Sequence, residues 1–304
     1  MISPLLLSAP SDTWYTQAPD WGWLIVVYFF LGGIAGGAAF LAAMLDLFGA
    51  PEDRPMARLG YTIALIAIAL AGPLLIVDLH RPERFWHQFI ESKSHGLMFK
   101  WWSPISYGSW GVTLFGLFVT LAVAGVLAER GILPRALRSL RDGGMGRVIS
   151  ALTGLLGLFV GGYTGILLAA TNRPLWADTT LLGLLFLLSG VSAAAAIMTL
   201  VGRRRTHPAS VHWLNQMDAW TSVIELAVLI VLALSLGSVA REVWGNGWGV
   251  LLVVGVVLVG LLLPLLLHWR PRLLGNLSVP SAAVLVIVGS FLLRTVIVLS
   301  SQAV

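Results

Sequence analysis

The sequence predicts an all-α integral membrane protein that crosses the bilayer eight times. Hydrophobic residues make up 58% of the 304 residues and charged residues only 11%, whereas an ordinary soluble domain has about 25% charged residues. The apolar residues form long unbroken runs, and one helical span needs about 20 of them. Strands of a membrane barrel would instead alternate in hydropathy over about 10 residues. Lipid is therefore expected to face most of the apolar side chains.

Eight apolar runs mark the expected spans, and turn residues or charges separate each run from the next. The spans cover residues 21–48, 58–79, 104–128, 148–170, 177–201, 214–236, 248–268 and 279–300. The two longest loops are expected at 80–103 and 129–147, and both carry several basic residues.

The distribution of Lys and Arg predicts the orientation of the chain. Twelve of them lie in or beside the loops that follow spans one, three, five and seven, and six lie in the other loops. Since basic loops stay in the cytoplasm, both termini are expected outside it. Trp14, Tyr15, Trp21 and Trp23 would then anchor the first span at the outer interface. The net charge of +5 therefore reflects membrane orientation, and no nucleic-acid partner is expected.

The loop 80–103 holds four of the six outer basic residues. Its side chains Phe85, Trp86, Phe89 and Ile90 suggest an amphipathic helix lying at the outer surface. Such a segment is either an interfacial anchor or a docking platform for an extramembrane partner, and both roles can coexist.

The absence of cysteine and the positions of the histidines limit the chemistry of the protein. The sequence has no Cys and six His, none in the middle of an expected span. A haem held between membrane helices needs axial ligands at facing depths, and an iron–sulfur cluster needs thiolates. We therefore expect no haem and no metal in this protein, and any cluster must belong to a partner.

Glycines recur at helical spacing in two places, 32–37 and 157–165. Small residues let helix backbones approach closely inside a membrane. A phosphate-binding loop is the competing interpretation, but it requires a strand before the glycines and a Lys after them. Close helix packing is the favoured interpretation.

Polar residues in the first four expected spans lie at one depth on the outer side, where random placement would scatter them. They are Tyr28, Asp78, Ser106, Tyr107, Tyr163 and Thr164. Polar residues at membrane depth are costly and usually face a cavity. Helix–helix hydrogen bonding and interfacial snorkelling are the alternatives. In the second half, Glu225 and Arg294 lie inside spans, either as a functional site or as a structural ion pair.

Four stretches of the first half resemble one family. They are WGWLIVVYFFLGGIAGGAAF at 21–40, DLHRPERFWH at 78–87, LMFKWWSPISYGSW at 97–110 and YTGILLAATNRPLW at 163–176. Together they resemble the NrfD family, which includes the membrane subunit of polysulphide reductase. The second half is similar only in hydropathy and helix number.

The resemblance implies a quinone-reactive membrane subunit in a prokaryotic cytoplasmic (inner) membrane, acting in electron transport and anaerobic respiration. Members have eight helices in two four-helix bundles, which implies bundles at 21–170, with the quinone site, and 177–300, after an outer tail at 1–20. They carry no haem and dock a ferredoxin-like iron–sulfur subunit, often joined to a molybdopterin catalytic subunit. The substrate would be menaquinone or ubiquinone, and the protein is not expected to be catalytic alone.

Site residues follow from the polar positions and from the resemblance, which places quinone contacts near Asp78–His80 and Tyr163. Asp78 and His80 are expected to exchange protons with the quinone. Hydrogen-bonding contacts to the quinone are expected from Tyr28, Tyr107, Tyr163 and Thr164. The expected proton path contains Glu225 and Arg294, and the expected docking residues are Arg81, Arg84 and Arg173.

Two other functions fit the same sequence. A secondary transporter would have two similar halves, helices broken at Pro73 and Pro264, and a substrate site near Glu225. The one-sided outer cluster argues against it, because transporter sites tend to lie at the midplane. A passive membrane anchor without a site is the remaining alternative.

Overall fold

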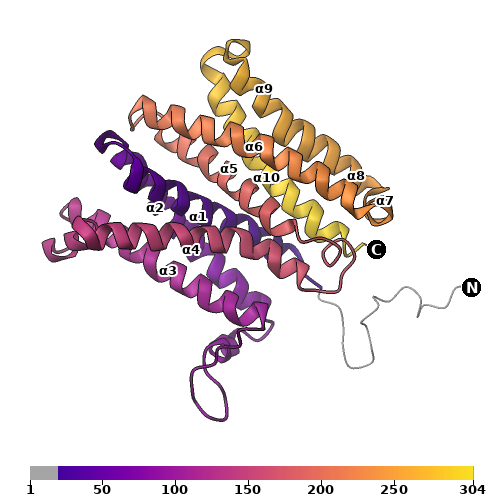
Figure 1. The fold of residues 1–304 in the computed structure, drawn as a ribbon, viewed down its shortest axis with the longest axis horizontal. Helices are drawn as coiled ribbons and strands as arrows, with labels where there is room; N and C mark the ends of the chain where they lie inside the picture. Colours follow the sequence, from indigo (N-terminus) through magenta and orange to yellow (C-terminus); the bar gives the residue numbers. More distant parts are fainter. Residues whose placement is uncertain (1–19, 304) are drawn as a thin grey trace, which may run out of the picture.

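The computed structural model describes residues 20–303, and these residues form helices joined by loops (Figure 1). The one β-type contact within this range is an isolated antiparallel bridge between Ile90 and Leu97. The all-α class is therefore confirmed for the described residues. Trp14 and Tyr15 of the expected interfacial anchor lie outside them, as does nearly all of the expected tail 1–20.

Eight helical segments within residues 20–303 are long and apolar enough to cross a membrane, which confirms the expected number. Six are α1 (Trp23–Phe48), α2 (Arg54–Asp78, after the short helix Pro51–Asp53), α3 (Pro104–Glu129), α4 (Gly143–Ala169), α5 (Leu182–Gly202) and α6 (Pro208–Leu236). The seventh combines α8 (Gly247–Val250), the π-helical stretch η5 (Leu251–Leu262) and α9 (Leu263–Trp269), and the eighth is α10 (Ser278–Ser300). The connections contain η3 (Pro82–Gln88), η4 (Arg135–Leu140), α7 (Ser238–Trp244), η6 (Pro271–Leu273) and η7 (Gly275–Leu277).

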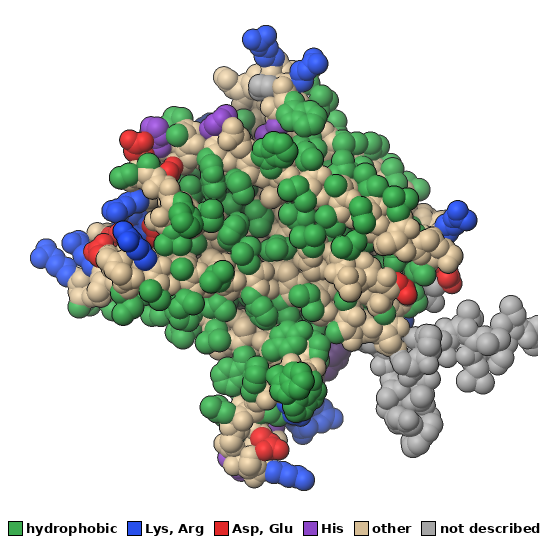
Figure 2. Space-filling model, in the orientation of Figure 1, with side chains coloured by type: hydrophobic (Ala, Val, Ile, Leu, Met, Phe, Trp, Pro, Cys, Tyr) green, Lys and Arg blue, Asp and Glu red, His purple; other side chains and the backbone are tan. Residues whose placement is uncertain are grey.

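Hydrophobic side chains cover the sides of the helix bundle, and most charged side chains visible in Figure 2 lie toward its ends. This distribution fits a bilayer, whose interior offers no water to charged groups or to unpaired backbone groups. Helix α6 begins six residues before its expected start because Pro208 occupies its first position. The ring of proline fixes φ at a helical value. Its missing N–H costs nothing at the first position of a helix, where an N–H would have no acceptor within the helix.

Helix α1 lies at the centre of the fold and packs against α2, α4, α5 and α10 (Figure 1). Its contacts with α4 and α5 depend on glycine. A Cβ at Gly36 would collide with the carbonyl oxygen of Gly157, and one at Gly37 would collide with the backbone of Gly190. The interpretation of these glycines as close-packing positions is confirmed.

We call the end of the bundle where α1 begins and α10 ends the terminal end, and the other the opposite end. At the terminal end, hydrogen bonds join the residues just before α1 to those just after α10. The amide of Gln302 donates to the carbonyl of Trp21 at 2.6 Å and accepts from its backbone N–H at 2.9 Å. The indole of Trp176 donates to the carbonyl of Ile297 at 2.7 Å. These bonds hold the start of α1 and the end of α10 beside the loop that follows α4.

The loop 80–103 also lies at the terminal end, and of the four residues expected in an amphipathic helix, Phe85 and Trp86 lie in a helix but Phe89 and Ile90 do not. Only Pro82–Gln88 is helical, as a short 3-10 segment. Beyond it the polypeptide turns back, so that the N–H of Met98 donates to the carbonyl of Phe89 at 2.7 Å. The loop satisfies its backbone groups by folding on itself, which the spacing of its aromatic residues did not reveal.

At the opposite end, an ionic network joins the first three helices to the loop after α3. Arg141 donates to Asp46 at 2.8 Å and to Glu129 at 3.1 Å, and Arg58 donates to Glu129 at 2.9 Å. The Arg141 side chain is 5% exposed. Both carboxylates are largely buried as well, so each depends on its cationic partner.

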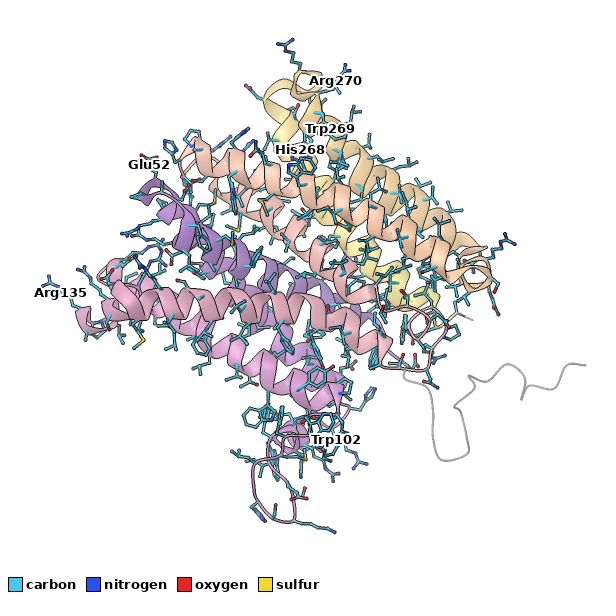
Figure 3. The ribbon with its side chains drawn as sticks, in the orientation of Figure 1. Glu52, Trp102, Arg135, His268, Trp269 and Arg270 are labelled. Atoms are coloured by element: carbon cyan, nitrogen blue, oxygen red, sulfur yellow. The ribbon has the colours of Figure 1, made fainter. Side chains whose placement is uncertain are left out.

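We predict that Arg141→Gln destabilises the protein by about 3 kcal/mol, because it leaves two largely buried carboxylates short of a cation. The midpoint of thermal unfolding in detergent measures the effect. Arg135→Gln is the matched control, since Arg135 lies in the same loop but is exposed (Figure 3). Equal midpoints for the two variants would show that the network is not stabilising.

Candidate functional site

A cavity of about 320 Å³ lies at the terminal end, between α1, α2, α3 and α4. Most of its lining is apolar, with a few hydroxyl, amide and carboxylate groups. The lining residues are Trp21, Ile25, Tyr28, Gly72, Leu75, Ile76, Asp78, Leu79, Phe85, Gln88, Phe89, Ile105, Gly108, Ser109, Val112, Thr113, Tyr163 and Leu167. A mostly apolar cavity with a few polar groups is typical of small-molecule sites.

Tyr28 supplies the polar group with the clearest need for a partner. It lies near the start of α1 and is fully buried. Its hydroxyl is one of three buried side-chain polar atoms within residues 20–303 that have no hydrogen-bond partner. An unpaired buried hydroxyl costs about 1–3 kcal/mol. A ligand carrying an acceptor oxygen would remove that cost.

Tyr163 lies on the seam between α3 and α4. Its hydroxyl donates to the carbonyl of Pro104 at 3.0 Å. Its ring stacks on Phe159 with centroids 5.5 Å apart and meets Tyr107 edge-on at 5.9 Å. The ring occupies the space left by Gly108, where a Cβ would overlap it. Tyr163 therefore presents a fixed aromatic wall to the cavity, with its hydrogen donated elsewhere.

Asp78 is the last residue of α2 and lines the cavity in a half-buried position. His80 follows two residues later with φ +57° and lies exposed outside the cavity lining. Its Nδ1 is 2.7 Å from the carbonyl oxygen of Asp78. The turn after α2 therefore brings His80 next to the backbone of Asp78 while its ring stays at the surface.

Two other expected contacts lie behind the cavity wall. Thr164 is fully buried and donates to the carbonyl of Gly161 at 3.1 Å, so its hydroxyl bonds within its own helix. Tyr107 packs against Tyr163 and Phe159. Ser106 is also outside the cavity lining, and its hydroxyl accepts from the N–H of Lys100 at 3.0 Å.

Sequence reasoning did not assign six polar or aromatic residues of the lining to the site. They are Trp21, Phe85, Gln88, Phe89, Ser109 and Thr113. Ser109 and Thr113 are four residues apart, and with Ile105 and Val112 they form one face of α3, so helical spacing could have identified that face. Gln88 could not be found this way, since only the fold of the loop brings it over the cavity.

Arg294, in the second half, is fully buried in α10 and donates to three helices. Its Nε donates to the carbonyl of Phe29 at 3.0 Å and its Nη2 to that of Phe186 at 3.1 Å. Its Nη1 donates to Ser290, at 2.7 Å to the hydroxyl, and to Ser189. Glu225 is also buried, and no direct ion pair joins it to Arg294 in the described part of the protein.

The expected docking residues all lie at the terminal end. Arg81 and Arg84 are exposed in the loop after α2, and Arg84 is 4.0 Å from Glu83. Arg173 is half-buried in the loop after α4. The exposed Trp101 and Trp102 extend the same surface, and Figure 3 shows Trp102 at the base of the projecting loop. Residues 20–303 contain no group of three or more His, Asp or Glu suited to a metal ion.

The fold defines a multi-span all-α membrane protein with a mostly apolar cavity at one end of its first four helices. The chain belongs to the NrfD family, because the family described as "Polysulphide reductase, NrfD" matches residues 15–304. The resemblance seen in the sequence is confirmed over both halves.

Named relatives agree with this assignment. The protein is 31% identical to "Protein NrfD" of Escherichia coli (strain K12), over 96% of its own length and 98% of the relative. It is 29% identical to a polysulfide reductase polypeptide of Wolinella succinogenes, over 82% of each. A shorter similarity, 23% identity over 36% of this protein and 24% of the relative, links it to one of the selenate reductase subunits of Mesobacillus selenatarsenatis.

We predict that Gly108→Ala lowers the stability of the protein by about 1–3 kcal/mol, because the new methyl group overpacks against the Tyr163 ring. Gly116→Ala on the same helix is the control, since a Cβ there meets nothing within 4 Å. Alanine in an open helical position is about 1 kcal/mol more favourable than glycine. Thermal unfolding that fails to separate the two variants would contradict the α3–α4 packing.

Proposed function

We propose that this protein binds a quinone, menaquinone or ubiquinone, in the terminal-end cavity and exchanges electrons between it and an iron–sulfur partner. The broader role, a membrane subunit of a reductase complex, is supported by family membership and by the names of the relatives. A transporter or a passive anchor has no such support. The protein alone would not be a complete enzyme, since it has no Cys to bind a cluster.

The unpaired hydroxyl of Tyr28 is the observation that carries the proposal. Quinone carbonyl oxygens accept hydrogen bonds, and Tyr28 has one to donate inside an apolar cavity. The cavity volume of about 320 Å³ suits a quinone head group, while its isoprenoid tail would extend into lipid. Tyr163, backed by Tyr107 and Thr164, would hold the ring in place through its aromatic face.

Proton exchange is assigned to Asp78, with His80 linking it to water. Reduction of a quinone to a quinol takes up two electrons and two protons. Asp78 lines the cavity and is half-buried, so its carboxyl can reach both the quinone and the exposed turn. A positioned carboxyl of this kind contributes proton transfer, while the redox chemistry belongs to the quinone.

The partner is proposed to dock at the terminal end, on Arg81, Arg84, Arg173 and the aromatic loop after α2. This surface adjoins the cavity, since Phe85 and Gln88 of the same loop line it. A ferredoxin-like subunit seated there, joined in turn to a molybdopterin catalytic subunit, would bring a cluster close to the quinone. In the proposed orientation, both termini and this surface lie outside the cytoplasm.

We predict that Tyr28→Phe weakens quinone binding about tenfold, since it removes one hydrogen bond from a buried site. Asp78→Asn should instead bind quinone normally and slow its turnover about a hundredfold. Tyr163→Phe should also impair turnover, more mildly, because its hydroxyl already bonds to Pro104. Quinone titration of the purified complex and steady-state quinone turnover separate these effects.

Tyr61→Phe is the control for the tyrosine variants, because Tyr61 is equally buried but lies at the opposite end beside Asp46. The quinone site would be misplaced if Tyr28→Phe and Asp78→Asn both keep full activity. It would also be misplaced if a quinone-site inhibitor bound between α5 and α10.

We predict that reversing the charge at Arg81 and Arg84 weakens co-purification of the iron–sulfur partner, because charge complementarity guides encounter and specificity. The double variant Arg203→Glu with Arg204→Glu removes equal charge at the opposite end and should leave assembly intact. Partner recovered per mole of this protein is the measurement. Equal recovery from both double variants would show that docking occurs elsewhere.

A further inference from the structure

A second cavity of about 440 Å³ lies at the opposite end, between α6, α9 and α10. Its wall is more polar than that of the first cavity. It includes His212, Asn215, Gln216, Trp220, His268 and Ser278. Figure 3 shows His268 and Trp269 near the tip of α9, on the far side of the bundle from Trp102. None of the roles proposed above uses this cavity.

His268 lines the cavity with its side chain only 10% exposed. Its Nδ1 is buried and has no hydrogen-bond partner within residues 20–303, although the Pro264 carbonyl one turn earlier interacts with the ring. Its Nε2 lies 3.5 Å from a carboxylate oxygen of Asp218 on α6. Nδ1 is therefore shielded from cavity water, whereas Nε2 faces a buried carboxylate.

Asp218 connects in turn to hydroxyl groups deeper in the bundle. The hydroxyl of Ser192 on α5 donates to the other oxygen of Asp218 and lies 3.3 Å from the hydroxyl of Ser222. Asp218, Ser222 and Glu225 are spaced four and three residues apart, which puts them on one face of α6. Ser192 and Glu225 also line one tight space, together with Ser189.

Neither Asp218 nor Glu225 forms a direct ion pair with a Lys or Arg among residues 20–303. Asp218 faces Ser192 of α5, Ser222 of its own helix and His268 of α9, and no Lys or Arg among residues 20–303 forms an ion pair with it. Glu225 faces the serines of α5 and α10. It interacts electrostatically with Arg294 but forms no direct ion pair with it. Two carboxyl groups buried at membrane depth without a direct ion pair to Lys or Arg point to a function.

We propose that the opposite-end cavity is a proton inlet, leading through His268, Asp218 and Ser192 to Glu225. A proton that enters by the cavity binds Nε2 of the neutral His268 ring and passes from Nε2 to Asp218. Asp218 then protonates the Ser192 hydroxyl as that hydroxyl releases its own proton toward Glu225. His268, Asp218 and Ser192 each give up one proton for each that they receive, Glu225 accepts the transferred proton, and no electron moves along this route.

Hydroxyl groups are needed because the inner part of the path is too tight for water. The space bounded by Ser189, Ser192, Glu225 and Ser290 has no room for a water molecule. A side-chain relay through Ser192 crosses this constriction without one. The inference rests on the proposed quinone function, since quinone turnover would drive this proton movement, separately from the proton exchange assigned to Asp78.

The test uses the complex that co-purifies with the full-length protein, reconstituted in liposomes with a pH dye on each side. A redox dye on the partner side drives quinone turnover. Asp218→Asn and His268→Gln should slow proton uptake at the opposite end about a hundredfold, with quinone affinity unchanged. Asp218→Glu should restore part of the rate. His212→Gln, which alters the exposed wall of the same cavity, should keep the full rate.

Each outcome decides the inference. Unchanged proton uptake in both Asp218→Asn and His268→Gln overturns it, and so does equal loss in His212→Gln. If Asp218→Asn fails to assemble, His268→Gln and Asp218→Glu decide alone. Normal quinone turnover without uptake at the opposite end in the unaltered protein removes the inlet but keeps the quinone function. Absence of quinone turnover in the unaltered complex removes both.

Discussion

Arg294 donates hydrogen bonds from α10 to carbonyl oxygens of α1 and α5, and the relation between the two halves of the protein depends on this contact. The guanidinium fits because Gly33 leaves no side chain in its way; a Cβ there would collide with it. A charge at this depth persists only when every donor is satisfied. Its bond to Phe29 also fixes the turn of α1 that carries Tyr28. One buried cation thus joins the helices of both cavities.

Small residues determine how the helices approach each other, and the polar ones among them add a second function. Glycines allow α1 to contact α4 and α5 at the backbone. Serines of α5 and α10 are also small enough for close helix packing. Their hydroxyls, including those of Ser189, Ser192 and Ser290, lie between Arg294, Glu225 and Asp218. In lipid, where apolar burial does not drive helix association, such contacts provide both packing and specificity.

The two cavities lie at opposite ends of the bundle and differ in chemistry. The terminal-end cavity is mostly apolar and carries an unpaired tyrosine hydroxyl, which suits a flat lipid-soluble ring. The opposite-end cavity is lined by imidazole, amide and hydroxyl groups, which suit water and protons. Arg294 and the serines Ser189, Ser192 and Ser290 lie between the two cavities. Under the functions proposed above, this protein would carry protons while a partner carries electrons.

The sequence by itself determined the membrane class, the eight spans, the family and the depth of the outer polar residues, because hydropathy and helical periodicity are local properties. It also identified Tyr28, Asp78 and Tyr163, which line the cavity. Only the tertiary structure decided that Tyr107 and Thr164 lie behind the wall, that Gln88 lies over the cavity, and that His268 on α9 reaches Asp218 on α6. Depth along a helix can be counted from sequence, whereas the direction a side chain faces is decided by the neighbouring helix.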